Sequence, residues 1–369
     1  MRIAADWIDR DGTQALCAAL RLSGYRAYFV GGCVRNALLG LPVADIDIAT
    51  DALPAAVIRT AEEAGFKVIP TGIDHGTVTV IAKGVIHEVT TFRRDVATDG
   101  RRATVAFSDD IAEDAARRDF TMNALYAEAS GRVIDPLGGM ADLRARRVRF
   151  VGDPHQRIRE DYLRILRFFR FHAVYGDPEA GIDAEGLAAC AELADGVETL
   201  SQERIGAEMR KLLAAPDPAP SIASMAQAGV LARVLPGSSE RGLAPLVHLE
   251  GGMAPRWQRR LAVLGGQADR LRLTRQEDAE LGKIRDEIGS TLAPAGLGWK
   301  LGEVAAQDVV LCRAAILETP LPQDWRAEVQ RGAQSVFPVS AADLMPELHG
   351  PEIGARLRLL QAGWLASGL

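Results

Sequence analysis

The chain has 369 residues, of which 48% are hydrophobic and 25% are charged, and its formal net charge at pH 7 is −6. This composition excludes disordered and collagen-like classes, and the length favours two or three domains. No stretch of about 18 apolar residues is free of charge, and residues 1–10 lack an apolar signal core. We therefore expect neither a membrane span nor secretion. The four cysteines are widely spaced without a Cys-x-x-Cys pair, which suits a cytoplasmic location.

Residues 1–143 predict a domain that contains both strands and helices. The strand-like runs are 28–30, 45–49, 77–82, 85–92, 104–107 and 132–134. Lys83-Gly84 separates two of these runs and predicts a hairpin. From Arg157 onward the apolar spacing changes to a helical period, with helices expected over 157–175 and 203–214. The fold class is therefore α+β, with a mixed-sheet domain followed by an all-helical region.

Composition also suggests where the helical region is divided. Residues 215–220 read Ala-Pro-Asp-Pro-Ala-Pro, which predicts a linker or a domain edge. We therefore expect three parts: a head at 1–143, a helical neck at 144–215, and a helical body and tail at 216–369.

Two carboxylates alternate along the strand predicted at 45–49. Asp45 and Asp47 would share one face of the strand, because successive side chains point to opposite faces. Two like charges roughly 7 Å apart repel each other unless a cation lies between them, and hard oxygen ligands suit Mg²⁺ bridged to phosphates. The alternative is a pair of exposed aspartates at a strand edge.

Glycines and further charged residues surround this pair in the sequence. Gly31-Gly32 follows a strand and precedes a helix, where backbone N–H groups can approach a triphosphate, although such a pair is often only a tight turn. Arg35 lies one turn into that helix and would clamp phosphate. Glu88, on the second arm of the hairpin, could supply a third carboxylate; the alternative is an exposed strand acid.

Arginine is concentrated in one segment. Residues 144–170 contain nine Arg against three acids, and such a run is either a solvated helix face or a surface that reads phosphates and bases.

Taken together, these motifs resemble a known family. Gly31-Gly32-x-Val34-Arg35 with Asp45-x-Asp47 resembles the DNA polymerase β nucleotidyltransferase superfamily, and more specifically the class II tRNA nucleotidyltransferases and bacterial poly(A) polymerases. Further blocks support the resemblance in the expected order. They are Arg-Arg-Asp-Phe-Thr-Met-Asn-Ala at 117–124, Asp-Pro-Leu-Gly-Gly at 135–139, Glu-Asp-x-x-Arg-x-x-Arg-x-x-Arg-Phe at 160–171, and Ser-x-Glu-Arg-Ile at 201–205. The segment 350–354 resembles the family's tail more weakly.

The resemblance assigns roles to matching positions. It implies that Asp45 and Asp47 bind metal and that Glu88 is the third catalytic acid. It places Gly32, Arg35 and Arg118 around the triphosphate, with Gly31 in the same turn. Residues 95–102 look like the family's flexible loop. One departure is Asn36, where the family usually has Asp, so the pairing that would hold Arg35 is in doubt.

The resemblance also implies that Asp161, Arg164, Arg167 and Arg170 form a nucleotide-recognition helix. Physically, a carboxylate that accepts hydrogen bonds and a guanidinium that donates them could fit the Watson–Crick edges of cytosine and adenine, whereas guanine and uracil present the wrong pattern. The alternative is that Asp161 and Arg164 pair with each other.

The function implied is template-independent addition of C, C and A to the 3′ acceptor end of tRNA, from CTP and ATP with Mg²⁺, releasing pyrophosphate. The helical C-terminal part is expected to hold tRNA through phosphates, with no obligate protein partner and no membrane. Alternatives are a poly(A) polymerase, a partial A-adding or CC-adding enzyme, or a non-catalytic RNA-binding protein.

Overall fold

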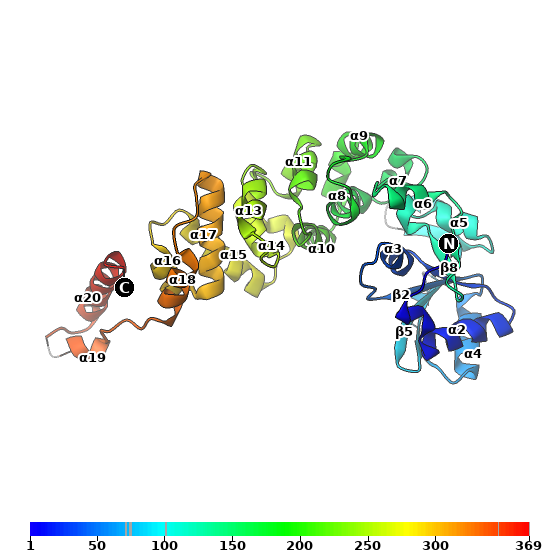
Figure 1. Ribbon diagram of the computed structural model, residues 1–369, viewed down its shortest axis with the longest axis horizontal. Helices are drawn as coiled ribbons and strands as arrows, with labels where there is room; N and C mark the ends of the chain where they lie inside the picture. Colours follow the sequence, from blue (N-terminus) through cyan, green and yellow to red (C-terminus); the bar gives the residue numbers. More distant parts are fainter. Residues whose placement is uncertain (71, 74–75, 100–101, 346, 369) are drawn as a thin grey trace. The chain divides into compact units, whose positions relative to one another are not determined.

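The computed structural model describes residues 1–70, 72–73, 76–99, 102–345 and 347–368. The chain divides into two compact units, Met1–Thr199 and Leu200–Leu369 (Figure 1). The division between them falls inside the segment 144–215 expected as a neck. The three-part organisation stays a prediction.

The first unit is built on a seven-stranded mixed sheet, with strand order β3-β4-β5-β2-β1-β8-β9. The strands are β1 (Ala27–Val30), β2 (Ile46–Thr50), β3 (Lys67–Ile69), β4 (Thr77–Ala82), β5 (Val85–Thr91), β8 (Tyr126–Glu128) and β9 (Val133–Ile134). Only β2 and β5 run parallel to each other, and the remaining neighbours are antiparallel. The mixed sheet followed by helices confirms the α+β prediction.

Two helices of the first unit pack on one face of this sheet. The helices of the unit are α1 (Asp6–Asp9), α2 (Asp11–Leu22), α3 (Gly32–Leu38), α4 (Pro54–Glu63), α5 (Ile111–Ala116), α6 (Gly139–Arg144), α7 (Pro154–Glu160), α8 (Leu163–Tyr175) and α9 (Ala184–Glu192), with 3₁₀ turns η2 (Thr121–Asn123) and η3 (Ala194–Thr199). Helices α2 and α4 pack on β4 and β5 (Figure 1). Thr13 of α2 lies 3.0 Å from His87 Nε2, so the neighbouring residue Glu88 points to the opposite face.

The short strands agree closely with the sequence prediction. The run 77–82 is β4, and 85–92 contains β5 (Val85–Thr91). Lys83 and Gly84 both have positive φ, 47° and 82°, as a tight two-residue hairpin turn requires.

The prediction of a loop at 95–102 is wrong for most of that segment. β6 (Arg93–Asp99) pairs antiparallel with β7 (Arg102–Phe107), so this part of the chain forms a separate two-stranded sheet. Residues 100–101 lie outside the described residues.

The single helix expected over 157–175 is also wrong. The chain breaks at Asp161, which has extended dihedrals (φ −157°, ψ 105°) between α7 and α8. Tertiary packing explains the break, because Tyr162 lies against Gly196: a Cβ at Gly196 would lie 2.0 Å from the Tyr162 ring. The apolar period cannot reveal a break that packing against a distant segment causes.

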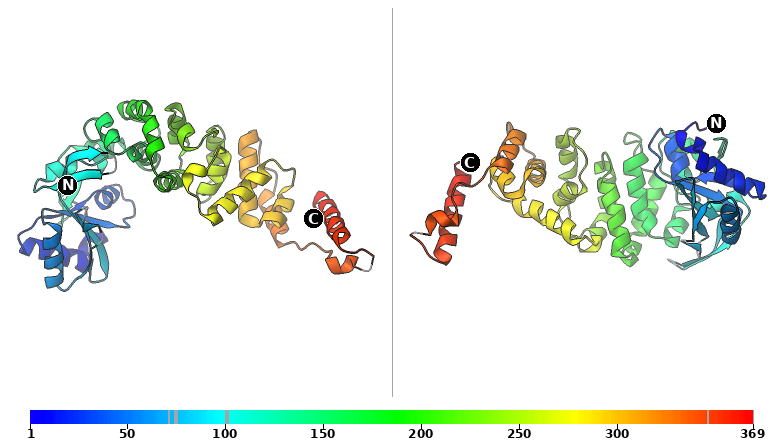
Figure 2. Two further views of the ribbon diagram at one scale, coloured as in Figure 1. Left: turned by 180° about the vertical axis from the view of Figure 1, so that it is seen from behind. Right: turned by 90° about the horizontal axis from the view of Figure 1, so that it is seen from below.

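The second unit is helical throughout its described residues (Figure 2). Its helices are α10 (Gln202–Leu213), α11 (Ala219–Gln227), α12 (Val230–Val234), α13 (Leu243–Glu250), α14 (Trp257–Leu264), α15 (Arg275–Ile288), α16 (Pro294–Leu301), α17 (Glu303–Leu317), α18 (Trp325–Gln334), α19 (Ala341–Leu344) and α20 (Pro351–Ala366), with the 3₁₀ turn η4 (Asp269–Leu271). Among the described residues, no helix has both the length and the apolarity needed to cross a membrane.

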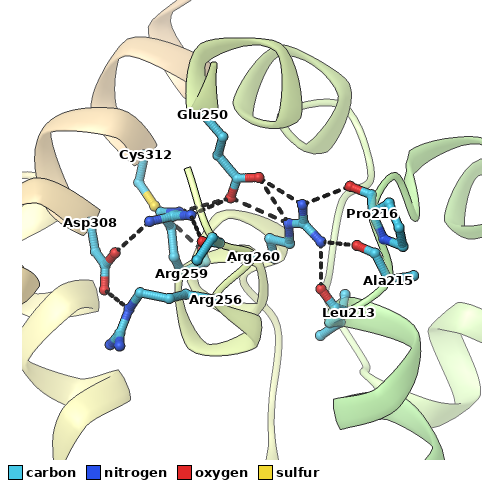
Figure 3. A network of polar contacts seen from close by, with 10 residues as sticks. Leu213, Ala215, Pro216, Glu250, Arg256, Arg259, Arg260, Asp308 and Cys312 are labelled. Carbon is cyan, nitrogen blue, oxygen red and sulfur yellow. Dashed lines mark hydrogen bonds and ion pairs between the residues drawn. The ribbon is translucent and has the colours of Figure 1, made fainter. Parts of the chain in front are cut away.

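A buried ionic network joins several of these helices (Figure 3). Arg260 donates to Glu250 and to the carbonyls of Leu213 and Pro216 at 2.7–3.3 Å, and also to the carbonyl of Ala215. The start of the Pro-rich segment, expected as a linker or a domain edge, is therefore hydrogen-bonded to α14 within the second unit.

The neighbouring arginine extends the network to the next helices. Arg259 donates to Glu250 on α13 and, at 3.0 Å, to Asp308 on α17. Arg256 reaches the other oxygen of Asp308 at 3.0 Å. These contacts tie α13, α14 and α17 together through charged side chains.

Candidate active site

The parallel pairing of β2 and β5 brings two of the predicted acids together. Asp47 lies directly opposite Glu88 in the register. Ile46 and Ile48, on the other face of β2, are buried, whereas Glu88 is exposed. Asp45 is exposed and comes immediately before β2, so it is not within the strand as the sequence predicted. The acids therefore gather on the face that α2 and α4 leave uncovered.

The electrostatics of these acids favour a bound cation. Burial raises the pKa of Asp47 to about 6; the charges of Glu88 and Asp45 also raise it, whereas Arg118 lowers it. The site thus holds closely spaced negative charge that no adjacent cation fully balances.

The carboxylates fit a metal ion whose remaining ligands come from the substrate. Among the described residues, no group of three His, Cys, Asp or Glu side chains is arranged to hold a metal ion by itself. Mg²⁺ typically binds one or two carboxylates together with substrate phosphates, and Asp45 and Asp47 offer such a partial set of oxygens.

The Gly31-Gly32 turn lies between β1 and α3. Gly31 adopts φ 69° and ψ −121°, a conformation that essentially only glycine tolerates, and its N–H donates to the carbonyl of Leu125 at 3.2 Å. A Cβ on Gly31 would lie 3.4 Å from Nη1 of Arg118. The fold therefore brings the turn and the predicted triphosphate arginine side by side.

Buried polar residues hold Arg118 at this turn. Its Nε donates to the Tyr126 hydroxyl at 3.0 Å and its Nη2 to Asp114 at 2.9 Å. Burial acts to lower the pKa of Arg118, but Tyr126 and Asp114 outweigh it and raise that pKa. The guanidinium is charged and fixed.

Arg35 is largely buried and is held by neutral groups. Its Nε and Nη2 donate to Asn36 Oδ1 at 3.1 and 2.8 Å, while Asn36 Nδ2 donates to the carbonyl of Pro42. The asparagine thus holds the arginine without a charge, which resolves the doubt that this departure raised. Nη2 also donates to the Tyr175 hydroxyl at 2.7 Å, and burial lowers the pKa of Arg35.

A chain of polar contacts runs from Arg35 to the arginines of α8. Asn123 accepts a hydrogen bond from Arg35 and donates to Asp119 Oδ1 at 2.8 Å. Asp119 Oδ2 accepts from Arg167 at 2.8 and 2.5 Å. Hydrogen bonds therefore connect Arg35, next to the Gly31-Gly32 turn, with Arg167 on α8 within the first unit.

The residues expected to form a nucleotide-recognition helix do not all lie on one helix. Arg164 pairs with Glu160 at 2.6 Å and also donates to the carbonyls of Arg157 and Arg117. Asp161 Oδ1 accepts from the N–H of Leu163 at 3.1 Å, as a residue preceding a helix does. Asp161 therefore lies before α8, and not on one helix with Arg164 as the resemblance implied, although the N–H of Arg164 donates to the carbonyl of Asp161 at 3.0 Å.

The other arginines of α8 keep the predicted spacing. Arg164, Arg167 and Arg170 are half-buried along the helix, whereas Ile165, Leu166, Phe168 and Phe169 form its buried side. Arg170 lies over the Phe171 ring, with 4.6 Å between guanidinium carbon and ring centroid.

Sequence reasoning missed several residues that shape the site: Asp114, Asp119, Asn123, Tyr126, Glu160 and Tyr175. Asp119 and Asn123 lie within a motif already noted at 117–124, and Glu160 within another, so those three could have been found. Tyr126 and Tyr175 carry no sequence signal, because only the fold brings them to Arg118 and Arg35.

The arrangement defines the class of protein, since paired acids beside a glycine turn on a mixed sheet are the head of a nucleotidyltransferase. A family model described as "Poly A polymerase head domain" matches residues 27–149, and one described as "Probable RNA and SrmB- binding site of polymerase A" matches 181–240.

Individual relatives narrow the class. A CCA-adding enzyme of Geobacillus kaustophilus is 35% identical over 311 residues, covering 84% of this chain and 71% of that protein. One from Geobacillus thermodenitrificans is 43% identical over 225 residues, covering 60% of this chain but only 54%, about half, of its own length. The Bacillus stearothermophilus CCA-adding enzyme, solved in complex with CTP, matches with a TM-score of 0.73 and 31% identity, covering 96% of this chain and 92% of that one. This chain belongs to the CCA-adding enzyme family of class II tRNA nucleotidyltransferases.

Proposed function

We propose that this chain adds C, C and A to the 3′ end of tRNA from CTP and ATP, releasing pyrophosphate. The observation that carries the proposal is the register of Asp47 opposite Glu88, with Arg118 placed at the Gly31 turn. The names of the relatives and the CTP complex of the similar structure support the same reaction.

Asp45 and Asp47 are proposed to hold Mg²⁺, and Glu88 is the proposed third catalytic acid. A bound Mg²⁺ would supply positive charge that neutralises the triphosphate and would favour ionisation of the 3′-hydroxyl, whose in-line attack on the α-phosphate releases pyrophosphate. The raised pKa of Asp47 supports this role, because burial and, less strongly, the charges of Glu88 and Asp45 disfavour the carboxylate, and a bound cation would stabilise it.

The triphosphate is proposed to lie at Gly31-Gly32. Arg118 presents Nη1 to this turn and would donate to phosphate oxygens. Arg35 lies beneath the turn: a Cβ on Gly32 would lie 3.9 Å from its Nη2, and most of its donors are bound to the protein. Arg35 would therefore shape this pocket and add positive charge to it.

Base selection is proposed to rest on Asp161 and Arg164, with Arg167 and Arg170 completing the segment. Glu160 and two carbonyls orient Arg164, which supports a fixed donor pattern. A carboxylate that accepts and a guanidinium that donates fit the edges of cytosine and adenine. The protein would thus take the place of a nucleic-acid template.

Two further expectations belong to the proposal. The helical second unit would hold tRNA mainly through phosphates, so binding should weaken as salt rises. A cytoplasmic location remains a prediction, and the four cysteines, which are all free and buried, suit it.

A second candidate function is poly(A) addition, which the descriptions of the two family models favour. The test gives the purified chain tRNA that ends before CCA, with each nucleoside triphosphate alone and all together. CCA addition predicts two residues from CTP alone and one further residue when ATP is added.

The other outcomes of this test separate the alternatives. A long tail from ATP alone on any RNA would identify a poly(A) polymerase, and arrest after CC or a need for pre-made CC would identify a partial enzyme. Binding of tRNA without incorporation, in buffer containing Mg²⁺, would leave only an RNA-binding role.

A further inference from the structure

Three side chains form a closed set of hydrogen bonds behind the Gly31 turn. Arg118 Nε donates to the Tyr126 hydroxyl at 3.0 Å, and Arg118 Nη2 donates to Asp114 Oδ2 at 2.9 Å. The Tyr126 hydroxyl in turn donates to the same carboxylate oxygen at 2.7 Å. Tyr126 and Asp114 are 0% and 1% exposed, so neither can exchange these partners for water.

This set leaves one edge of the guanidinium available. Nη1 faces the Gly31 turn, 3.4 Å from where a Cβ would stand, and donates no hydrogen bond within the described part of the chain. An arginine whose other two nitrogens are fixed presents its remaining donors in one direction, which reduces the entropy lost on binding an anion.

We propose that the Tyr126 hydroxyl is a positioning group for nucleotide binding, because it aims Arg118 at the triphosphate. This inference rests on the proposed function and adds to it a residue from β8 that lies outside every motif of the sequence. Tyr126 itself does not contact substrate; it acts through Arg118.

The substitution Tyr126→Phe isolates the hydroxyl. Phenylalanine retains the ring, which the Arg118 guanidinium approaches to 5.3 Å, and retains the packing against β1. Asp114 keeps its contact with Arg117 Nε at 2.9 Å, so the buried carboxylate stays paired. The substitution removes the hydrogen bond that orients Arg118 and the one from the hydroxyl to Asp114, whose carboxylate keeps both arginine partners.

The expected result is that KM for CTP and for ATP rises by the same factor, about 5- to 10-fold, while kcat changes less than about 2-fold. The matched control is Tyr28→Phe on the neighbouring strand β1. The Tyr28 ring stacks on Phe92 with centroids 6.2 Å apart and packs against the core cluster that contains Tyr126, but its hydroxyl makes no hydrogen bond within the described residues. The control should keep both KM values.

A double-mutant cycle separates positioning from general stability. In the Arg118→Ala background, Tyr126→Phe should change neither KM further, because the group it positions is gone. An equal rise in both backgrounds, or a rise for only one nucleotide, overturns the inference.

A second variant covers the case in which Tyr126→Phe does not fold. Arg118→Lys keeps the charge, but a single ammonium cannot hold Asp114 and Tyr126 and reach the turn at once. It should raise both KM values to a similar extent. Wild-type KM values in Arg118→Lys would show that charge alone suffices and would overturn the inference.

Binding of inorganic tripolyphosphate, measured by calorimetry on the full chain, separates this inference from the proposed function. Weaker binding by Tyr126→Phe supports the inference even if no nucleotide is added to tRNA. Unchanged binding by an enzyme that adds CCA overturns the inference and leaves the proposed function intact.

Discussion

The two units use arginine in opposite ways. In the second unit Arg260 is 1% exposed and donates to Glu250 and to three backbone carbonyls, which engages every nitrogen of its guanidinium (Figure 3). In the first unit Arg118 is 18% exposed, and its Nη1 is left facing the Gly31 turn. An arginine that the protein fully satisfies stabilises the fold, whereas one with a free, aimed edge can bind an anion.

Carboxylates divide in the same way. Glu250 accepts from two buried arginines and is internally neutralised. Asp47 faces Glu88 and Asp45 instead; burial raises its pKa, and the charges of these two acids raise it further. Buried pairing marks structure, and unbalanced charge on an open face marks a site for a cation.

The largest effect on activity should come from removing one of the acids Asp45, Asp47 and Glu88. Asp47→Ala or Asp45→Ala is expected to lower incorporation about 1,000-fold or more, since a metal-centred contact is worth several kcal/mol, and to leave tRNA binding nearly intact. Glu88→Gln keeps the shape and should be milder. Single-turnover incorporation and filter binding measure the two properties.

The control for this prediction lies at the other end of β2. Asp51 pairs with Arg26 at 2.7 Å, away from the acids, and Asp51→Ala should retain activity. Near-normal turnover by Asp47→Ala in magnesium buffer would remove Asp47 from the metal site.

Substitutions in the buried network of Arg260 and Glu250 should instead lower the stability of the fold. Arg260→Met strips Glu250 of one partner and leaves three carbonyls unpaired, which is expected to cost about 3–5 kcal/mol in the free energy of unfolding. Urea denaturation of the full chain measures the loss.

An exposed arginine in the same unit provides the comparison. Arg272 is 67% exposed and lies 3.4 Å from Glu203, and such surface pairs contribute about 0–1 kcal/mol. Equal losses for Arg260→Met and Arg272→Met would contradict the contrast between satisfied and exposed arginines.

Specificity provides a finer test within the first unit. Arg164→Ala and Asp161→Ala should relax the choice of base, because each unpaired polar group penalises the wrong nucleotide by roughly 1–3 kcal/mol. Arg118→Ala should instead raise KM for all four nucleotides about equally. Single-nucleotide incorporation with CTP, ATP, GTP and UTP, on tRNA lacking CCA and on tRNA ending in CC, measures both.

Arg159, an exposed arginine on α7, is the matched control for this series. Arg159→Ala should choose among the four nucleotides as the wild type does. If Arg164→Ala loses only rate and keeps its selectivity, base selection must be assigned to other residues.

The smallest effect concerns pH. Burial acts to raise the pKa of Asp114, but the charges of Arg118 and Arg117 outweigh it and lower that pKa to about 2. Because the unfolded chain binds this proton near pH 4, the stabilisation is complete above that pH and is lost as pH falls toward 2. The unfolding free energies of wild type and Asp114→Asn should therefore converge by about 2 kcal/mol between pH 5 and 2.

Asp308 gives the opposite expectation in the second unit. Burial outweighs Arg256 and Arg259 there and raises the pKa of Asp308. The difference in the free energy of unfolding between wild type and Asp308→Asn should accordingly not become smaller as the pH falls. For Asp114→Asn, a difference in the free energy of unfolding from wild type that stays constant between pH 5 and 2 would show that the charge of Asp114 does not stabilise its contacts with Arg117 and Arg118.

Local patterns predicted much of the first unit. The runs 77–82 and 85–92 and the Lys83-Gly84 turn follow from alternation and turn chemistry, which act over a few residues, whereas Asp45 lies just before β2 and not within it. The break at Asp161 did not follow, because it depends on Tyr162 packing against Gly196, more than 30 residues away along the chain.

The amino-acid pattern predicted the kind of chemistry from two acids that lie two residues apart, a Gly-Gly turn and an arginine-rich segment in a recognisable order. Only the tertiary structure decided which charges are neutralised internally and which are left for a ligand. Arg118 lies in a motif that the family resemblance identified and Arg260 lies in none, but nothing in the sequence shows which donors of either side chain are already bound. Their roles differ because partners such as Tyr126 and the carbonyls of 213–216 come from other elements, and hydrogen bonding over such sequence separations is set by the packing of the whole fold.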